Sequence, residues 1–101
     1  MVKIHGRWCG PNWTNNQVKP AEDANAADRK GKCMDQLDCA CKVHDLQIKD
    51  NGPSFESDTE LMRKAEAILG NPLYFIINPG MYASARVVRE GMRLGRWTRQ
   101  Q

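Results

Sequence analysis

The chain has 101 residues, four cysteines and a formal net charge of +3 at pH 7. This length predicts a single domain over residues 1–101, with a hydrophobic core that is adequate but not large. Every apolar run is far shorter than the roughly 20 residues of a membrane-spanning helix, which excludes an integral membrane protein. Four cysteines in so short a chain predict disulfides that stabilise such a core, if the compartment is oxidising.

Charge is distributed unevenly along the chain. Residues 1–60 carry 8 basic and 10 acidic side chains, a net charge of −2, whereas residues 61–101 carry 7 basic and 2 acidic ones, a net charge of +5. A basic cluster suits an anionic partner such as phospholipid headgroups or nucleic acid, although it also occurs on an ordinary solvent-exposed helix face. The C-terminal arginines concerned are Arg86, Arg89, Arg93, Arg96 and Arg99.

Residues 5–16 read H-G-R-W-C-G-P-N-W-T-N-N and contain turn-forming residues at the density of a structured loop. Gly6, Gly10 and Asn12 adopt positive φ angles most easily, so the backbone can curl until several carbonyl oxygens converge. Calcium binds oxygen ligands of this kind, including main-chain carbonyls. The loop is therefore a candidate calcium loop; the alternative is an ordinary tight loop held in place by Cys9.

A helix is predicted from about Asp35 to residues 50–53, where D-N-G-P forms a strong breaker cluster. The polar residues 17–32 before it predict a loop with at most one helical turn, ended by Gly31.

One face of this predicted helix is apolar except for a histidine. Its members, at helical spacing, are Leu37, Cys41, His44 and Ile48. Asp45 lies about 100° further round the helix, at the edge of this face. A histidine in such a position, with an acid beside it, requires either a buried partner or a cleft.

A second helix begins at Ser57-Asp58-Thr59-Glu60, which has the form of a capping box with Ser57 as N-cap. Gly70 and Asn71-Pro72 close it. Extending its apolar face one turn towards the N-terminus reaches Asp58, so this helix also carries one ionisable group on its buried side. The apolar positions are Leu61, Met62, Ala65, Ile68 and Leu69.

The short connection between the two helices predicts an antiparallel hairpin, which brings His44 close to Asp58. An imidazole that donates one N–H to a carboxylate keeps its other nitrogen as a base. The alternative is a buried pair that only satisfies its own hydrogen bonds.

Two further segments follow. Residues 73–77, L-Y-F-I-I, are apolar and predict either a core segment or an interfacial one. A last helix, roughly Met81 to Leu94, places an apolar face opposite its arginines, with the members Met81, Ala85, Val88 and Met92.

The loop W-C-G-P-N-W-T, the D-x-x-D of Asp35 and Asp38 and the C-x-x-H-D of Cys41 to Asp45 resemble the phospholipase A2 superfamily. That family has a Y-C-G-x-G calcium loop followed by D-x-x-D-x-C-C-x-x-H-D. The resemblance covers residues 6–14 and 35–48. Because the chain is short and poor in cysteine, it looks more like the compact bacterial, fungal and viral-capsid members than the venom or pancreatic ones.

The resemblance implies a role for each matching position. His44 would activate a water as general base, Asp58 would orient His44, and the N–H of Gly10 would complete the oxyanion site. Calcium would bind the carboxylate of Asp45 and three main-chain oxygens, those of Trp8, Gly10 and Asn12. The implied fold is mainly α, with the calcium loop, two antiparallel catalytic helices and the basic C-terminal helix.

The resemblance also implies a disulfide between Cys9 and Cys41, which leaves Cys33 and Cys39 to pair by exclusion. Three positions depart from the family pattern. Asn12 stands where the family usually has glycine, Ala40 replaces the first of two adjacent cysteines, and Ile48 replaces a tyrosine that supports the histidine in many members.

The implied activity is calcium-dependent hydrolysis of the sn-2 ester of a glycerophospholipid. An unperturbed histidine pKa near 6.5 suits a general base at neutral pH. The expected partner is a phospholipid surface, bound peripherally through Trp8, Trp13 or the basic helix; we do not expect nucleic acid. The expected location is extracellular, or within a larger exported or virion protein, with no signal peptide in this chain.

Two other functions fit parts of the sequence. In the first, zinc bound by cysteines and a histidine would build a binding module with a nucleic-acid-binding tail, although the ligand spacing matches none of the usual zinc patterns. Its ligands would be Cys33, Cys39, Cys41 and His44. In the second, the chain keeps the phospholipase-like fold but has lost the activity, and binds lipid or metal only.

Overall fold

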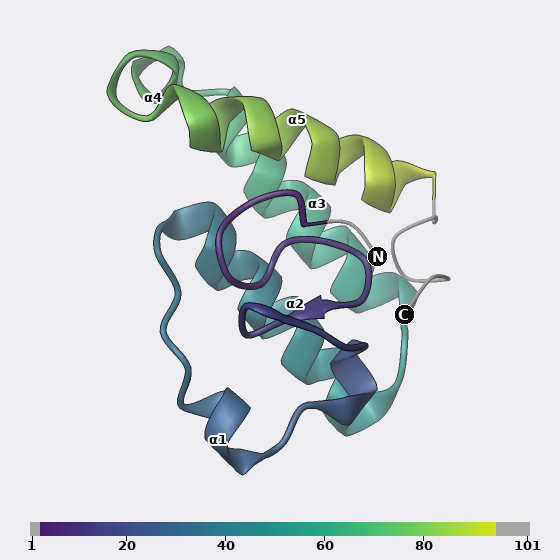
Figure 1. Cartoon of the computed structure of the whole chain (residues 1–101). Helices are drawn as coiled ribbons and strands as arrows, with labels where there is room; N and C mark the ends of the chain where they lie inside the picture. Colours follow the sequence, from purple (N-terminus) through teal and green to yellow (C-terminus); the bar gives the residue numbers. More distant parts are fainter. Residues whose placement is uncertain (1–2, 95–101) are drawn as a thin grey trace.

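The computed structural model of the protein describes residues 3–94 and is mainly helical (Figure 1). The N-terminal third has little regular structure: two short strands, β1 (Trp13–Thr14) and β2 (Gln17–Val18), pair as an antiparallel hairpin, and a 3-10 turn, η1 (Ala21–Asp23), follows. The helices of the described chain are α1 (Ala26–Arg29), α2 (Gln36–Asn51), α3 (Phe55–Leu69), α4 (Pro72–Ile77) and α5 (Pro79–Arg93). The hairpin strands were not predicted; the single turn of helix before Gly31 is α1, which confirms that prediction.

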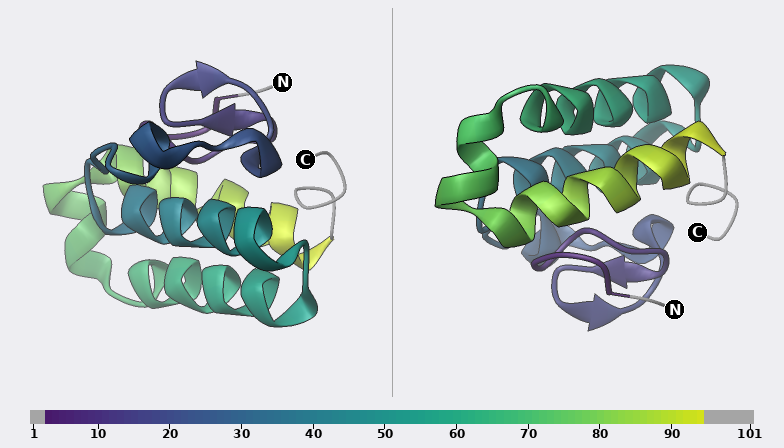
Figure 2. Two further views of the ribbon diagram at one scale, coloured as in Figure 1. Left: turned by 90° about the horizontal axis from the view of Figure 1, so that it is seen from below. Right: turned by 90° about the horizontal axis from the view of Figure 1, so that it is seen from above.

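The helices α2 and α3 form an antiparallel pair, and α5 packs along α3 (Figure 2). Asp35 caps the start of α2 by accepting a hydrogen bond from the N–H of Asp38 at 2.9 Å. Gly52, with a φ of 79°, ends α2 in a conformation that L-residues rarely adopt. The predicted bounds of this helix are therefore confirmed, as is the hairpin.

The N-terminus of α3 differs from the prediction. The helix begins at Phe55, and its N-cap is Ser54, whose side chain accepts a hydrogen bond from the N–H of Ser57 at 3.1 Å. Ser57 therefore lies inside the first turn and is buried. Serine is a favoured N-cap residue, so either position was suitable. Ser54, which follows Pro53, has the extended backbone of an N-cap and therefore caps the helix.

The core lies between these helices and the N-terminal loop. The apolar faces predicted for the last two long helices are confirmed at their main positions, with Leu61, Ala65 and Ile68 buried on α3 and Met81, Ala85, Val88 and Met92 buried on α5. Trp8 and Cys9 of the loop join Leu37 and Cys41 of α2 in the same cluster. The N-terminal loop is thus part of the core.

Residues 73–77 are not a core segment, which makes that alternative wrong. They lie in α4, which has no buried residue. The helix turns the chain between α3 and α5 at one end of the molecule (Figure 1). The interfacial alternative for this segment stays a prediction.

Candidate active site

The α2–α3 hairpin joins His44 to Asp58. Nε2 of His44 lies 2.8 Å from Oδ1 of Asp58, although the two residues belong to different helices. Because a carboxylate only accepts hydrogen bonds, Nε2 carries the proton and donates it. The side chain of His44 is 1% exposed and that of Asp58 is 20% exposed. The predicted contact is confirmed.

The second nitrogen of His44 points towards Asp45. Nδ1 lies 3.9 Å from Oδ1 of Asp45, which is an electrostatic contact beyond hydrogen-bond distance. Among residues 3–94, no group accepts or donates a hydrogen bond at Nδ1. Ile48, one turn further along α2, is buried and apolar, so it provides no polar support from the position where a tyrosine was expected. Nδ1 is therefore the nitrogen that remains for a small ligand such as water.

The two aspartates raise the pKa of His44 above its ordinary value of 6.5. Burial alone would lower this pKa, because it disfavours the imidazolium. The interactions of the ring with the carboxylates of Asp45 and Asp58 outweigh burial and favour the protonated form. From the sequence, we expected an unperturbed pKa for His44. The shift in pKa depends on two carboxylates on different sides of the ring, which spacing along one helix does not predict.

The N-terminal loop is attached to α2 one turn before Asp45. A disulfide joins Cys9 to Cys41, with 5.2 Å between their Cα atoms, and Asp45 follows Cys41 by one helical turn. A second disulfide joins Cys33 to Cys39. Both pairings are as expected, and the Cys9–Cys41 bridge attaches the loop to the face of α2 that carries Cys41 and Asp45.

The loop curls as its composition indicated. Gly6 has a φ of 60°, Gly10 of 148° and Asn12 of 54°. Asn15 and Asn16 also have positive φ angles, 50° and 62°, which the sequence argument did not anticipate. Asparagine tolerates this region, so the Asn12 that departs from the family pattern keeps the backbone conformation that glycine would have.

Asp38 holds the loop in place, a role that the sequence argument missed. Its buried carboxylate accepts hydrogen bonds from the N–H groups of Arg7 at 3.0 Å, Trp8 at 2.8 Å and Met34 at 2.9 Å. A Cβ at Gly6 would lie 2.5 Å from the carboxyl carbon of Asp38, so only glycine fits there. The spacing could have indicated this role, because Asp38 precedes Asp45 by seven residues and so lies on the same helix face.

The site contains oxygen donors of the kind that calcium takes, one carboxylate and several main-chain carbonyls. No three His, Cys, Asp or Glu side chains within residues 3–94 form a possible metal cluster. The fully buried carboxylate of Asp45 provides the negative charge beside the loop. Within the described chain, the carbonyls of Trp8 and Asn12 accept no hydrogen bond, and that of Gly10 accepts one from Trp13 at 3.2 Å, which leaves a lone pair. One carboxylate and these main-chain oxygens match the oxygen donors that calcium takes.

The tryptophans differ in position. Trp8 is 0% exposed and donates its Nε1–H to the carbonyl of Lys32 at 2.9 Å, so the idea that it contacts a membrane is wrong. Trp13 is half-buried and donates to the carbonyl of Gly6 at 3.2 Å. Trp8 packs in the core cluster, and the sequence of the loop did not predict this position.

A second histidine–aspartate pair lies at the other end of α2. Nε2 of His5 is 2.7 Å from Oδ2 of Asp35, and Asn78 approaches the same oxygen at 3.5 Å. This contact connects the N-terminal segment, α2 and the start of α5. Sequence spacing alone gives no signal for it, because the two residues are 30 positions apart.

The zinc alternative is not supported. All four cysteines are in disulfides, so none is available as a thiolate ligand. Of the basic C-terminal residues, Arg86 and Arg93 are exposed on α5 and Arg89 is half-buried. Arg96 and Arg99 lie outside the described residues.

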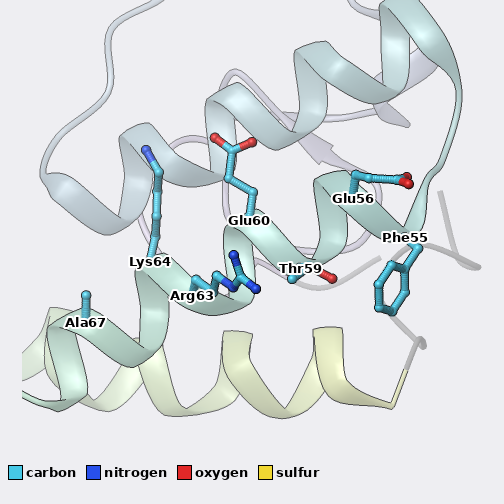
Figure 3. Close-up of a pocket in the computed structure, with 7 residues that line it drawn as sticks. All are labelled: Phe55, Glu56, Thr59, Glu60, Arg63, Lys64 and Ala67. Carbon is cyan, nitrogen blue, oxygen red and sulfur yellow. The ribbon is translucent and has the colours of Figure 1, made fainter.

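Surface hollows border α3 on more than one side. One follows its outer face and includes none of the candidate site residues (Figure 3); its lining consists of Phe55, Glu56, Thr59, Glu60, Arg63, Lys64 and Ala67. Another lies between α3 and the end of α5 and does reach the site, because Asp58 lines it together with Phe55, Thr59, Met62, Met92, Arg93 and Leu94.

Within residues 3–94, no helix is both long and apolar enough to cross a membrane. Comparison of the chain with models of protein families, with curated proteins and with solved structures gave no match. The geometry and chemistry of the site therefore carry the functional argument.

Proposed function

We propose that the protein is a calcium-dependent phospholipase A2, which hydrolyses the sn-2 ester of glycerophospholipids to a lysophospholipid and a fatty acid. The observation that carries this proposal is the orientation of His44, whose Nε2 lies 2.8 Å from Asp58 while Nδ1 faces Asp45. The resemblance of residues 6–14 and 35–48 to the superfamily supports it. The fold would then be a compact variant of the phospholipase A2 fold.

His44 is the general base in this proposal. Asp58 accepts the proton of Nε2, which fixes the tautomer and leaves the lone pair of Nδ1 directed away from α3. A water at Nδ1 loses its proton to the ring as its oxygen attacks the ester carbonyl. Water is the nucleophile, so no acyl-enzyme forms and no serine or cysteine nucleophile is needed.

The loop supplies the electrophilic side of the reaction. Asp45 and the main-chain oxygens of Trp8, Gly10 and Asn12 would hold calcium, which when bound polarises the ester carbonyl. The N–H of Gly10 donates no hydrogen bond within residues 3–94, so it is available for the oxyanion. Asp38 and the Cys9–Cys41 disulfide keep these groups in position before substrate arrives.

An acyl chain requires an apolar surface beside the base. The hollow between α3 and α5 offers one next to Asp58, with Met62, Met92 and Leu94 on its walls. Arg93 at its edge is a suitable contact for the lipid phosphate. The hollow thus offers apolar walls on the Asp58 side of the His44–Asp58 pair.

Bound calcium would also offset the raised pKa of His44. Without the ion, the two aspartates raise the pKa of His44. A dication held by Asp45 would oppose the imidazolium and lower this pKa. Binding of the metal and activation of the base are thus coupled through one carboxylate.

A liposome assay tests the proposal. We expect hydrolysis of phosphatidylcholine in calcium and none in EGTA, with lysophospholipid and free fatty acid identified by mass. Equal hydrolysis in EGTA, or full activity of His44→Ala, would contradict the mechanism.

One observation favours a second candidate, a protein that binds calcium and lipid without cleaving the ester. His44 and Asp45 are only 1% and 0% exposed, so a substrate reaches them only if neighbouring groups move. The same liposome assay separates the two functions when it is paired with calorimetry. Calcium binding to the intact chain with no product would support the binding protein, whereas product would support the enzyme.

A further inference from the structure

The helix α4 exposes a cluster of large apolar side chains. Leu73 is 54% exposed, Phe75 63%, Ile76 74% and Ile77 63%, and none of the residues of the helix is buried. Single exposed apolar residues are common on proteins, but a contiguous group usually marks a binding surface. The group lies on a short helix at one end of the molecule, where the chain turns from α3 into α5 (Figure 1).

This helix is held firmly by its flanks. Asn71 caps its start by accepting a hydrogen bond from the N–H of Leu73 at 3.1 Å, and Asn78, its C-cap, caps α5 in turn by accepting from Met81 at 3.2 Å. The ring of Phe75 packs edge-on against that of Tyr82, with 5.5 Å between their centroids. The apolar side chains are therefore presented on an ordered helix whose first N–H groups have partners or belong to proline, as entry into an apolar phase requires.

The charges around α4 suit a lipid headgroup layer. Residues 60–89, which extend twelve residues to either side of α4, carry four basic and two acidic side chains, a net charge of +2: Arg63, Lys64, Arg86 and Arg89 against Glu60 and Glu66. Asp35, which Asn78 approaches, is already in contact with His5. Exposed apolar side chains in a segment of net positive charge match an anionic membrane interface.

The dimensions of α4 fit insertion into the interface and no deeper. Six residues of helix span about 9 Å, against roughly 30 Å for the hydrocarbon core of a bilayer. Interfacial helices bury their apolar face about 5–10 Å into the boundary between headgroups and acyl chains. Tyr74, which is partly buried beneath the exposed group, contacts Gln36 of α2 through its hydroxyl at 3.3 Å.

We propose that α4 is the membrane-binding element of this protein, and that Leu73, Phe75, Ile76 and Ile77 insert into the surface of a phospholipid bilayer. The choice of lipid as the occupant rests on the proposed function, because an enzyme that cleaves phospholipids must remain at their surface. The element is separate from the catalytic groups: α4 adjoins the first turn of α2, whereas His44 lies about two turns further along that helix.

Binding of the full chain to vesicles tests the proposal without any hydrolysis. The probe is a vesicle of ether-linked phosphatidylcholine and phosphatidylglycerol in EGTA, so that neither an sn-2 ester nor calcium is present. We expect the double variant Phe75→Ser/Ile76→Ser to lower the partition coefficient about tenfold or more. The matched control is Val18→Ser/Met34→Ser, which changes side chains that are 64% and 69% exposed elsewhere, and we expect it to bind like the wild type.

A variant that gains affinity distinguishes a specific effect at α4 from misfolding of the double variant. Ile76→Trp places a residue that favours the headgroup region on the same surface, and we expect it to raise the partition coefficient. Equal binding of the wild type and the double variant would overturn the proposal. It would also be overturned if sedimentation showed that the double variant dissociates a lipid-independent dimer, because α4 would then bind a second copy of the chain.

Hydrolysis of a short-chain phospholipid below its micellar concentration separates this proposal from the proposed function. We expect the α4 double variant to cleave such a monomeric substrate as the wild type does, because its active site is intact. If neither protein cleaves it but vesicle binding still depends on α4, the membrane element stands and the enzymatic function fails. If both cleave it and vesicle binding is independent of α4, the enzyme stands and this inference fails.

Discussion

His5 and His44 each contact a carboxylate through Nε2, at 2.7 Å from Asp35 and 2.8 Å from Asp58. The pairs lie towards opposite ends of α2 and differ in their surroundings. His5 is 15% exposed and joins the N-terminal segment to the cap of α2. His44 is 1% exposed, and a second carboxylate, that of Asp45, lies 3.9 Å from its other nitrogen.

The comparison shows that a histidine–aspartate contact does not by itself make a catalytic site. What distinguishes His44 is the group that faces its second nitrogen and the loop that the Cys9–Cys41 disulfide attaches nearby. These features set Nδ1 beside the carboxylate of Asp45, the candidate metal ligand. The contact of His5 links the N-terminal segment to the start of α2. Among the hydrogen bonds of residues 3–94, none involves the second ring nitrogen of His5.

The largest expected effect separates the two histidines directly. Replacing His44 with alanine removes the proposed base, and we expect ester hydrolysis to fall about a thousandfold, within the range typical of general-base catalysis. His5→Ala should retain activity within about threefold, because it loses one partly exposed contact. Initial rates on phosphatidylcholine liposomes measure both. Similar losses in the two variants would mean that the pairs do not differ in function.

The two disulfides differ in the length of chain that they close, 32 residues for Cys9–Cys41 and 6 for Cys33–Cys39. Replacing both members of the longer bridge with alanine should cost about 3–4 kcal/mol of unfolding free energy, against about 2 kcal/mol for the shorter one. Guanidinium unfolding of the two double variants gives the values. A larger loss from the shorter bridge would show that chain entropy does not dominate here.

The orienting carboxylates allow a finer comparison. Asp58→Asn keeps the shape of the side chain but no longer stabilises the required tautomer and charge of His44, so we expect activity to fall roughly tenfold to a hundredfold. Asp35→Asn should leave activity almost unchanged, since asparagine caps a helix as well as aspartate does. Turnover at saturating substrate and melting temperature are the measurements. An equal loss of turnover in both variants would argue against a specific role for Asp58.

The smallest expected effect is on the pH dependence of stability without calcium. The pKa of His44 is raised in the folded protein, so its stabilising contribution is complete below the unfolded value of about 6.5 and is lost as pH rises through the folded value. Melting temperatures in EGTA from pH 5.5 to 9 should therefore decline less steeply for His44→Gln than for the wild type. His5→Gln is the control and should follow the wild type. An unchanged slope in His44→Gln would contradict the assigned shift.

Asp28 adds a stabilising effect at the acidic end. Burial would raise its pKa, but hydrogen bonds from Lys19, Asn15 and the N–H of Asn25 outweigh burial and lower it below 3.8. Its contribution to stability is therefore present above about pH 3.8 and lost as pH falls through the folded value. Nothing in the sequence of residues 17–32 predicted that Asp28 is buried, because its hydrogen-bond partners come from separate turns.

Local pattern was sufficient wherever one helix face determined the outcome. The apolar positions of α3 and α5, the bounds of α2 and the positive φ angles of Gly6, Gly10 and Asn12 were all predicted from residue type and spacing. The N-cap of α3 was misassigned because two serines competed for it. The segment 73–77 was ambiguous because an apolar pentapeptide has the same composition whether it is buried or exposed.

By itself, the sequence determined the three long helices apart from the start of α3, the curled loop and the opposition of His44 and Asp58, because each depends on spacing along one or two adjacent elements. Only the tertiary structure decided that Asp38 anchors the loop, that Trp8 lies in the core, that His5 meets Asp35 and that α4 is exposed. These contacts join residues about 30 positions apart or depend on which surfaces remain uncovered. Such features follow from packing of the whole chain, which spacing within a single segment does not encode.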